Sequence, residues 1–274
     1  MDDRPIGVFD SGVGGLTVVK QVLDNLPNEG IVYFGDTARG PYGPKSPRVV
    51  TQFAVENARF LLSKKVKIIV VACNTASAVA LNPLRERFDL PVVGVVEAGA
   101  RAAVARTRNG KVGVIGTIGT ITSQAYRRAI SALNPSLQIY AQACPLFVSL
   151  AEEGWTDGKA ALLIAKEYLK PLRKQGIDTL LLGCTHYPLL RKTIQMAVGE
   201  KVVLADCGEE VVREIRSLLS ERQLQANATT EPDREFFLSD VPHRFQETGE
   251  RFLGRPLGNL RLKRTEPRLV RGLW

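Results

Sequence analysis

The 274-residue chain has few cysteines and histidines. Both residue types commonly bind metals, and cysteines also form disulfides. Its four cysteines are Cys73, Cys144, Cys184 and Cys207. They form no Cys-x-x-Cys pair and none of the spacings of zinc sites. With His186 and His243 as the two histidines, a histidine-rich metal centre is not expected either. The sequence therefore predicts no metal, and each cysteine must be judged by its neighbours.

Long hydrophobic runs are also missing. The longest, such as 68–73 and 179–183, are far shorter than the roughly 20 residues needed to cross a bilayer. The first residues, Met-Asp-Asp-Arg, carry acids where a secretory signal carries bases followed by an apolar stretch. We therefore expect a soluble, cytoplasmic protein whose cysteines stay reduced.

No feature of a nucleic-acid-binding module accompanies the net charge of +9. Residues 241–274 hold eight Arg and Lys against three Glu, so much of the excess lies in the C-terminal tail. Apolar residues make up 45% and charged residues 24%, an ordinary globular composition. A solvated basic surface is the favoured interpretation, and nucleic-acid binding is disfavoured.

Short apolar runs alternate with amphipathic stretches along the chain. This alternation predicts an α/β protein with mostly parallel sheets covered by helices on both faces. The length is comfortable for two domains with a cleft between them. The apolar runs are 6–9, 31–34, 68–72, 92–96, 112–115, 139–142, 180–182 and 202–205, and the helical stretches include 47–62, 123–133, 159–174 and 209–223.

Small polar residues follow the apolar runs directly. The carboxyl edge of an open α/β sheet is where ligands bind, so these segments mark the predicted site. A weak internal echo, Val-Ala-Cys-Asn-Thr in one half and Leu-Gly-Cys-Thr-His in the other, puts a cysteine at the same place in each half. The segments are Asp10-Ser11-Gly12, Asp36-Thr37, Cys73-Asn74-Thr75, Gly116-Thr117 and Cys184-Thr185-His186.

The segment 10–15 looks like a dinucleotide loop, but Thr17 stands where G-x-G-x-x-G needs glycine. Asp10 could instead receive an ammonium group, or simply cap the next helix. A buried cysteine is usually a small core residue, which we expect for Cys144 and Cys207. Cys73 and Cys184 differ, because thiols near helix N-termini can have a lowered pKa and be partly ionised at neutral pH.

Four blocks of sequence resemble the glutamate racemases of the aspartate/glutamate racemase superfamily. They are Asp-Ser-Gly-Val-Gly-Gly-Leu-Thr-Val at 10–18, Gly-Asp-Thr-Ala-Arg-Gly-Pro-Tyr-Gly at 35–43, Ala-Cys-Asn-Thr-Ala-Ser at 72–77 and Gly-Cys-Thr-His-Tyr-Pro at 183–188. The resemblance runs from about residue 4 to 206–208, and the arginine-rich tail after about 255 matches no feature of the family.

The resemblance implies an isomerase that interconverts L- and D-glutamate without a cofactor and supplies D-glutamate for peptidoglycan. Cys73 would deprotonate D-glutamate and Cys184 L-glutamate. We expect two doubly wound (Rossmann-like) lobes, 1–97 plus about 208–274 and 98–207, with the active site in the cleft between them; the return of the C-terminal segment to the first lobe rests partly on the resemblance. Because homodimers are common, we also expect a homodimer, and a cell-wall precursor is a candidate effector.

The other site residues are also assigned by this resemblance. Asp10 and His186 would assist proton transfer, and Glu152 would be an acid near the cleft, its alternative being a solvated helix-end charge. The substrate-binding residues would be Asp10, Ser11, Asn74, Thr75, Thr117, Thr185, His186 and the backbone at Tyr42 and Gly43.

Three other functions stay open. The first is an aspartate or hydantoin racemase of the same superfamily. The second is a basic binding protein, for example one acting on DNA gyrase. The third is a thiol hydrolase pairing Cys184 with His186, which a straight strand would not bring together.

Overall fold

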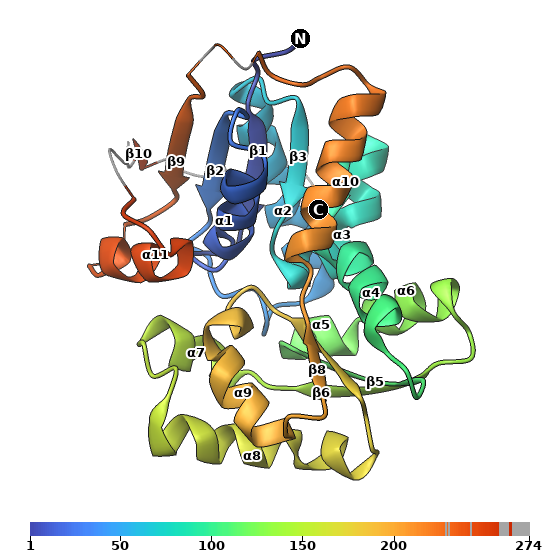
Figure 1. Ribbon diagram of the computed structural model, residues 1–274. Coiled ribbons are helices and arrows are strands. Elements are labelled where there is room, and N and C mark those ends of the chain that lie inside the picture. Colours follow the sequence, from blue (N-terminus) through green and yellow to red (C-terminus); the bar gives the residue numbers. More distant parts are fainter. Residues whose placement is uncertain (228, 230, 242, 258–262, 265–274) are drawn as a thin grey trace.

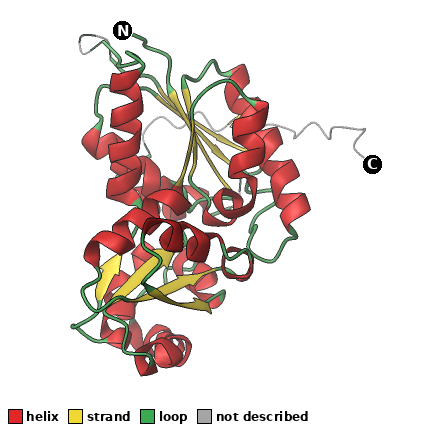
Figure 2. Cartoon of the chain, turned by 90° about the vertical axis from the view of Figure 1, so that its right-hand side faces the viewer, coloured by secondary structure: helices red, strands yellow, loops and turns green. Residues whose placement is uncertain are grey.

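The structure is a computed structural model that describes residues 1–227, 229, 231–241, 243–257 and 263–264. The chain forms two lobes, one above the other, and each lobe contains one sheet of parallel strands (Figures 1 and 2). The upper sheet has the strand order β10-β9-β2-β1-β3-β4 and the lower sheet β6-β5-β7-β8. The predicted fold class, two α/β lobes with parallel sheets, is confirmed.

The strands are β1 Ile6–Asp10, β2 Ile31–Gly35, β3 Ile68–Val71, β4 Val92–Gly94, β5 Lys111–Gly116, β6 Gln138–Ala143, β7 Thr179–Gly183, β8 Val203–Ala205, β9 Arg234–Leu238 and β10 Lys263–Arg264. The helices are α1 Leu16–Asn25, α2 Pro47–Ser63, α3 Asn74–Arg87, α4 Val95–Arg106, α5 Ile118–Thr122, α6 Ala125–Leu133, α7 Leu146–Glu152, α8 Gly158–Lys174, the 3-10 helix η1 Tyr187–Leu190, α9 Arg191–Val198, α10 Gly208–Glu221 and α11 Phe245–Leu253.

Helices cover both faces of the upper sheet because its strands are apolar on both sides. Phe9 and Val71 pack with α2 and α3 in one core, whereas Val8 and Val70 pack with α1 and α10 in another. Successive strand residues point to opposite faces, so neighbouring positions enter different cores. The lower sheet follows the same plan, with Val114 packed against α4 and α6 and Ile115 in the core of α7, α8 and α9.

Strands β4, β9 and β10 differ from the sequence-based expectation. The apolar run 92–96 is divided, because β4 ends at Gly94 and α4 begins at Val95. The Val96 N–H donates to Ser77 Oγ at 3.2 Å, which satisfies a free N–H of the first turn. Strands β9 and β10 were not predicted; β9 pairs in parallel with β2, and β10 pairs in parallel with β9.

The chain crosses between the lobes twice. The upper sheet uses residues 6–94 and 234–264, and the lower sheet uses 111–205, so α4 and the segment before α10 join them. We propose the lobe bounds 1–97 with about 208–274, and 98–207. The arginine-rich end of the tail, beyond residue 264, lies outside the described residues. No helix in the described part of the chain is long and apolar enough to cross a membrane.

Candidate active site

Segments that follow strands of the two sheets meet between the lobes, where Thr75, after β3, lies 2.8 Å from Thr117, after β5. Cys73 follows β3 of the upper sheet, and Cys184 follows β7 of the lower sheet. Both side chains are buried, and the charge of Cys184 acts on Cys73. The structure thus brings together the two cysteines that the sequence singled out.

Cys73 occupies the N-cap of α3. Its Sγ accepts the Ala76 N–H at 3.5 Å and lies 3.6 Å from Ser11 Oγ. Burial raises the pKa of Cys73 to about 12, and the nearby Asp10 acts in the same direction against the two hydrogen bonds. The expectation of a lowered pKa is therefore wrong for Cys73, because desolvation outweighs the helix N-terminus.

Cys184 lies in a turn instead of a straight strand, so it meets a histidine two residues away. His186 Nδ1 is 3.8 Å from Cys184 Sγ and 3.4 Å from Thr185 Oγ1. His186 Nε2 lies 2.9 Å from Glu152 Oε1, at the end of α7. The geometric argument against a Cys184–His186 contact is thus corrected by the turn.

The charge of His186 depends on its two partners. Burial favours the neutral imidazole, but the hydrogen bonds and charges of Cys184 and Glu152 raise the pKa of His186 to about 10. A protonated imidazole donates from both ring nitrogens, to Cys184 on one side and Glu152 on the other. The Glu152 side chain is 45% exposed, so it is both a helix-end charge and the partner of His186.

Asp10 ends β1 and is fully buried. Its Oδ2 accepts the Gly12 N–H at 3.0 Å, and its Oδ1 has no hydrogen-bond partner among the described residues. It does not cap α1, whose N-cap is Gly15. Burial raises the pKa of Asp10, whereas His186 and the backbone N–H groups of the loop lower it.

The residues after Cys73 reach the lower lobe. Asn74 Oδ1 accepts the Tyr126 hydroxyl at 2.5 Å, and Asn74 Nδ2 has no hydrogen-bond partner in the described part of the chain. Thr75 Oγ1 lies 2.8 Å from Thr117 Oγ1 and 3.2 Å from Thr120 Oγ1. The hydroxyls of Thr75 and Thr117, both predicted to bind substrate, bond to each other across the lobes.

The Tyr42–Gly43 backbone also faces the lower lobe. The Gly43 carbonyl accepts the Gly119 N–H at 2.8 Å, and a Cβ at Gly43 would lie 2.8 Å from Thr117. The phenol of Tyr42 points the other way, where its hydroxyl donates to Asp36 and accepts from Asn57 at 3.1 Å. Backbone groups, not the phenol, are therefore what this loop offers to the cleft.

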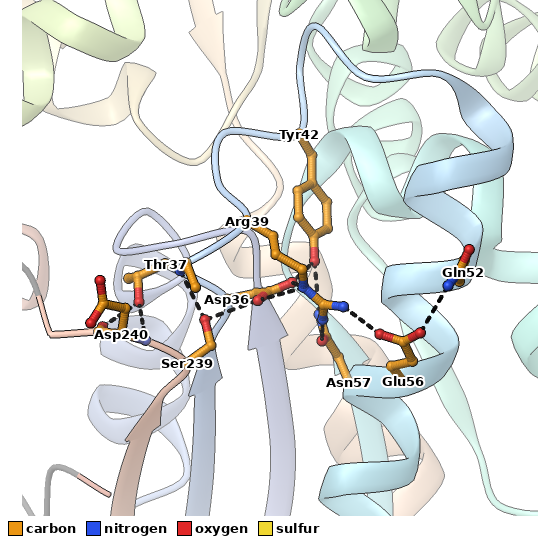
Figure 3. Close-up of polar contacts among 10 residues, drawn as sticks. Asp36, Thr37, Arg39, Tyr42, Gln52, Glu56, Asn57, Ser239 and Asp240 are labelled. Carbon is orange, nitrogen blue, oxygen red and sulfur yellow. Dashed lines mark hydrogen bonds and ion pairs between the residues drawn. The ribbon is translucent and has the colours of Figure 1, made fainter. Parts of the chain in front are cut away.

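A charged network that the sequence did not reveal holds this loop (Figure 3). Arg39 Nε donates to Asp36 at 2.8 Å, Arg39 Nη2 donates to Asn57 at 3.0 Å, and Nη1 pairs with Glu56. Ser239, just after β9, donates to Asp36 Oδ1 at 2.9 Å. The loop is thereby fastened to α2 and to the C-terminal part of the upper lobe.

The lobes meet closely beside Cys184. A Cβ at Gly14 would lie 2.3 Å from Thr185 Oγ1 and 2.5 Å from His186 Cε1. Next to this contact is a cavity of about 290 Å³, whose lining includes Ser11, Glu152 and His186. In the described part of the chain, no group of three or more His, Cys, Asp or Glu residues could hold a metal ion.

Two facing α/β lobes, each with a cysteine after a central strand, define the class of protein. The chain belongs to the Asp/Glu/Hydantoin racemase family, whose model matches residues 6–215. More particularly, it is 53% identical over 257 residues to the glutamate racemase of Geobacter metallireducens, covering 94% of this chain and 95% of the relative. The similarity thus extends well beyond 206–208, the limit that the four blocks suggested.

Solved structures agree with this family. The crystal structure of glutamate racemase from Francisella tularensis in complex with D-glutamate has a TM-score of 0.90 and 42% identity, covering 96% of this chain and 98% of that one. A glutamate racemase isoform from Bacillus anthracis has a TM-score of 0.91 and 40% identity, and the match covers 97% of this chain and 98% of that one. The resemblance inferred from the four blocks is confirmed.

Proposed function

We propose that the protein is a glutamate racemase that interconverts L- and D-glutamate with two thiols and no cofactor. Cys184 deprotonates L-glutamate, and Cys73 deprotonates D-glutamate. The observation that carries this proposal is the pair of buried thiols at facing strand ends, one beside Asp10 and the other beside the His186–Glu152 pair. The D-glutamate in the Francisella relative supports the choice of substrate.

The reaction needs one thiolate and one thiol. The thiolate takes the α-proton, and the electron pair that remains on the α-carbon is delocalised into the α-carboxylate. The opposite thiol then gives its proton to the other face of the carbon, so the product leaves with the two sulfurs in exchanged protonation states. Because one group acts on each face, neither has to move around the substrate.

The unpartnered atoms of the site match an amino acid. Asp10 Oδ1 is a buried acceptor and Asn74 Nδ2 a buried donor, each without a hydrogen-bond partner among the described residues. Buried polar atoms normally find partners. The ammonium group of glutamate satisfies the first atom, and a carboxylate satisfies the second. Thr185, Ser11 and the backbone at Tyr42–Gly43 complete the binding of the substrate.

His186 and Glu152 support the Cys184 side. With a pKa of about 10, His186 is a cation at neutral pH and donates to Cys184 when the sulfur is a thiolate. Glu152 holds the ring through Nε2. Asp10 serves the Cys73 side, where its charge state changes the cost of forming a thiolate.

The test is circular dichroism of L- and D-glutamate with metal-free, cofactor-free protein. We expect wild type to bring both enantiomers to one endpoint, and Cys73→Ser and Cys184→Ser to lose about 10³-fold in rate. Cys144→Ser and Cys207→Ser are the matched controls, because these thiols are equally buried and take no part in the mechanism. Normal racemisation by the first two variants would overturn the two-thiol mechanism.

A panel containing aspartate and hydantoins separates this function from related ones. Faster turnover of either than of glutamate would contradict the substrate assignment. The same proposal includes four further points. The enzyme supplies D-glutamate for peptidoglycan, lies in the cytoplasm, forms a homodimer and is controlled by a cell-wall precursor.

A further inference from the structure

Tyr126, in the first turn of α6, lies between the two cysteine-bearing segments. Its side chain is 3% exposed. A Cβ at Gly183 would lie 2.8 Å from Tyr126 Cε2, and a Cβ at Gly99 would lie 3.0 Å from Tyr126 Cε1. The ring thus fits against two positions that lack side chains, one of them the residue before Cys184.

The hydroxyl of Tyr126 ends at the other cysteine-bearing segment. It donates to Oδ1 of Asn74, the residue after Cys73, at 2.5 Å. One rigid side chain of the lower lobe therefore contacts the backbone that carries Cys184 and the side chain that follows Cys73.

This hydrogen bond also fixes which way the Asn74 amide faces. An amide has one acceptor oxygen and one donor nitrogen, and the phenol takes the oxygen. Asn74 Nδ2 is then left as a buried donor without a partner in the described part of the chain. In the opposite orientation, the amide would offer an oxygen where the carboxylate of a substrate needs an N–H.

We propose that Tyr126 is a positioning residue that orients the Asn74 amide toward the substrate carboxylate and sets the spacing of the two thiol-bearing segments. The inference rests on the proposed function, since it gives Asn74 a substrate to bind. Tyr126 acts through Asn74 and does not itself touch the reacting atoms.

Tyr126→Phe isolates the hydroxyl, because the ring keeps its place against Gly99 and Gly183. We expect kcat/KM to fall about 10-fold, mainly through a higher KM, since Asn74 binds the carboxylate throughout the reaction. The enantiomers have equal free energies, so kcat/KM must fall equally for both. Asn74→Asp, which keeps the acceptor for Tyr126 but replaces the N–H by an oxygen, should lose more.

Tyr187→Phe is the matched control. Tyr187 is also fully buried in the lower lobe, and its hydroxyl donates to the Cys144 carbonyl at 2.9 Å. Both Phe variants lose one buried hydrogen bond, so their melting temperatures should fall by similar amounts. Only Tyr126→Phe should raise KM.

A double-mutant cycle decides whether Tyr126 acts through Asn74. In the Asn74→Ala background, adding Tyr126→Phe should change kcat/KM by less than about two-fold. If the losses in kcat/KM of the two single variants multiply in the double variant, the proposal is overturned. A KM for Tyr126→Phe equal to that of wild type would also overturn it. If wild type racemises glutamate and the cysteine variants do not, such a result removes only this inference. If wild type racemises no amino acid, both proposals fail.

Discussion

The two cysteines lie in corresponding places but in unlike electrostatic surroundings. Cys73 has a buried carboxyl, Asp10, as its charged neighbour, and burial raises its pKa to about 12. Cys184 has His186 as its neighbour, a cation at neutral pH that Glu152 holds in place. The charged neighbour is thus a carboxyl at Cys73 and an imidazole at Cys184.

This difference shows that a symmetric reaction does not need a symmetric site. Asp10 lies within electrostatic reach of both Cys73 and His186, so the protonation states around the two thiols are coupled. The variants below test that comparison, in order of decreasing effect.

Removing the cation beside Cys184 should have the largest effect on activity. His186→Gln keeps a hydrogen-bonding side chain but cannot carry charge, and we expect kcat to fall about 10³-fold. His243→Gln, which changes the other histidine of the sequence, should be silent. Full activity of His186→Gln would contradict the charge assigned to this side of the site.

The same variant tests the pKa of His186 through stability. Because the folded-state pKa, about 10, lies above the unfolded value of 6.5, protonation favours the folded protein. That contribution is fully present below about pH 6.5 and is lost as the pH rises through about 10. The melting temperature of wild type should therefore exceed that of His186→Gln by an amount that shrinks across this window.

Neutralising the carboxyl beside Cys73 should reduce the electrostatic difference between the surroundings of Cys73 and Cys184. Asp10→Asn removes one of the causes that raise the pKa of Cys73, so alkylation of Cys73 should begin at lower pH. Under the proposed mechanism, in which Asp10 assists proton transfer, turnover should still fall by about 10²-fold. Mass spectrometry of alkylated protein across pH measures the first effect. An unchanged alkylation profile would show that burial alone governs this thiol.

The charged network on the Cys73 side should affect binding more than chemistry. Arg39→Ala leaves Asp36 and Glu56 without their partner, and breaking a buried ion pair costs about 3 kcal/mol of unfolding free energy. The loop of Tyr42 and Gly43 should then bind glutamate several-fold less tightly, with kcat reduced less. Arg85→Ala, which breaks an exposed pair with Glu97, is the control.

The smallest effect should come from the outer partner of His186. Glu152→Gln keeps a hydrogen-bond acceptor but loses the charge, and the side chain is 45% exposed. We expect kcat to fall about three-fold and the alkaline limb of the pH profile to move to lower pH, because the pKa of His186 falls. Glu153→Gln, one residue away, should leave the profile in place.

The sequence could predict the strands and the place of the site because both depend on local patterns. Apolar runs such as 6–9 and 68–72 are buried on both faces and read as parallel strands, and polar residues after them mark the ligand edge. Strand β9 escaped detection because its sequence, Arg-Glu-Phe-Phe-Leu, begins with two charged residues. The division of 92–96 depends on Ser77, which is distant in sequence.

The charges and pairings within the site could not be predicted in the same way. The contact of Cys184 with His186 requires a turn, and the raised pKa of Cys73 follows from burial and from the nearby Asp10. The contacts of Thr75 with Thr117 and of Asn74 with Tyr126 join residues from opposite lobes. Such pairs leave no periodic signal in a single sequence.

Gly14 and Gly43 have a consequence for how this enzyme can vary. At each position, a single added carbon would meet the opposite lobe, at 2.3 Å for Gly14 and 2.8 Å for Gly43. The close approach of the two lobes at these points therefore depends on the absence of a side chain. A substitution to alanine at either glycine would act as a spacer one methyl group thick, holding the thiols apart without altering any group that reacts.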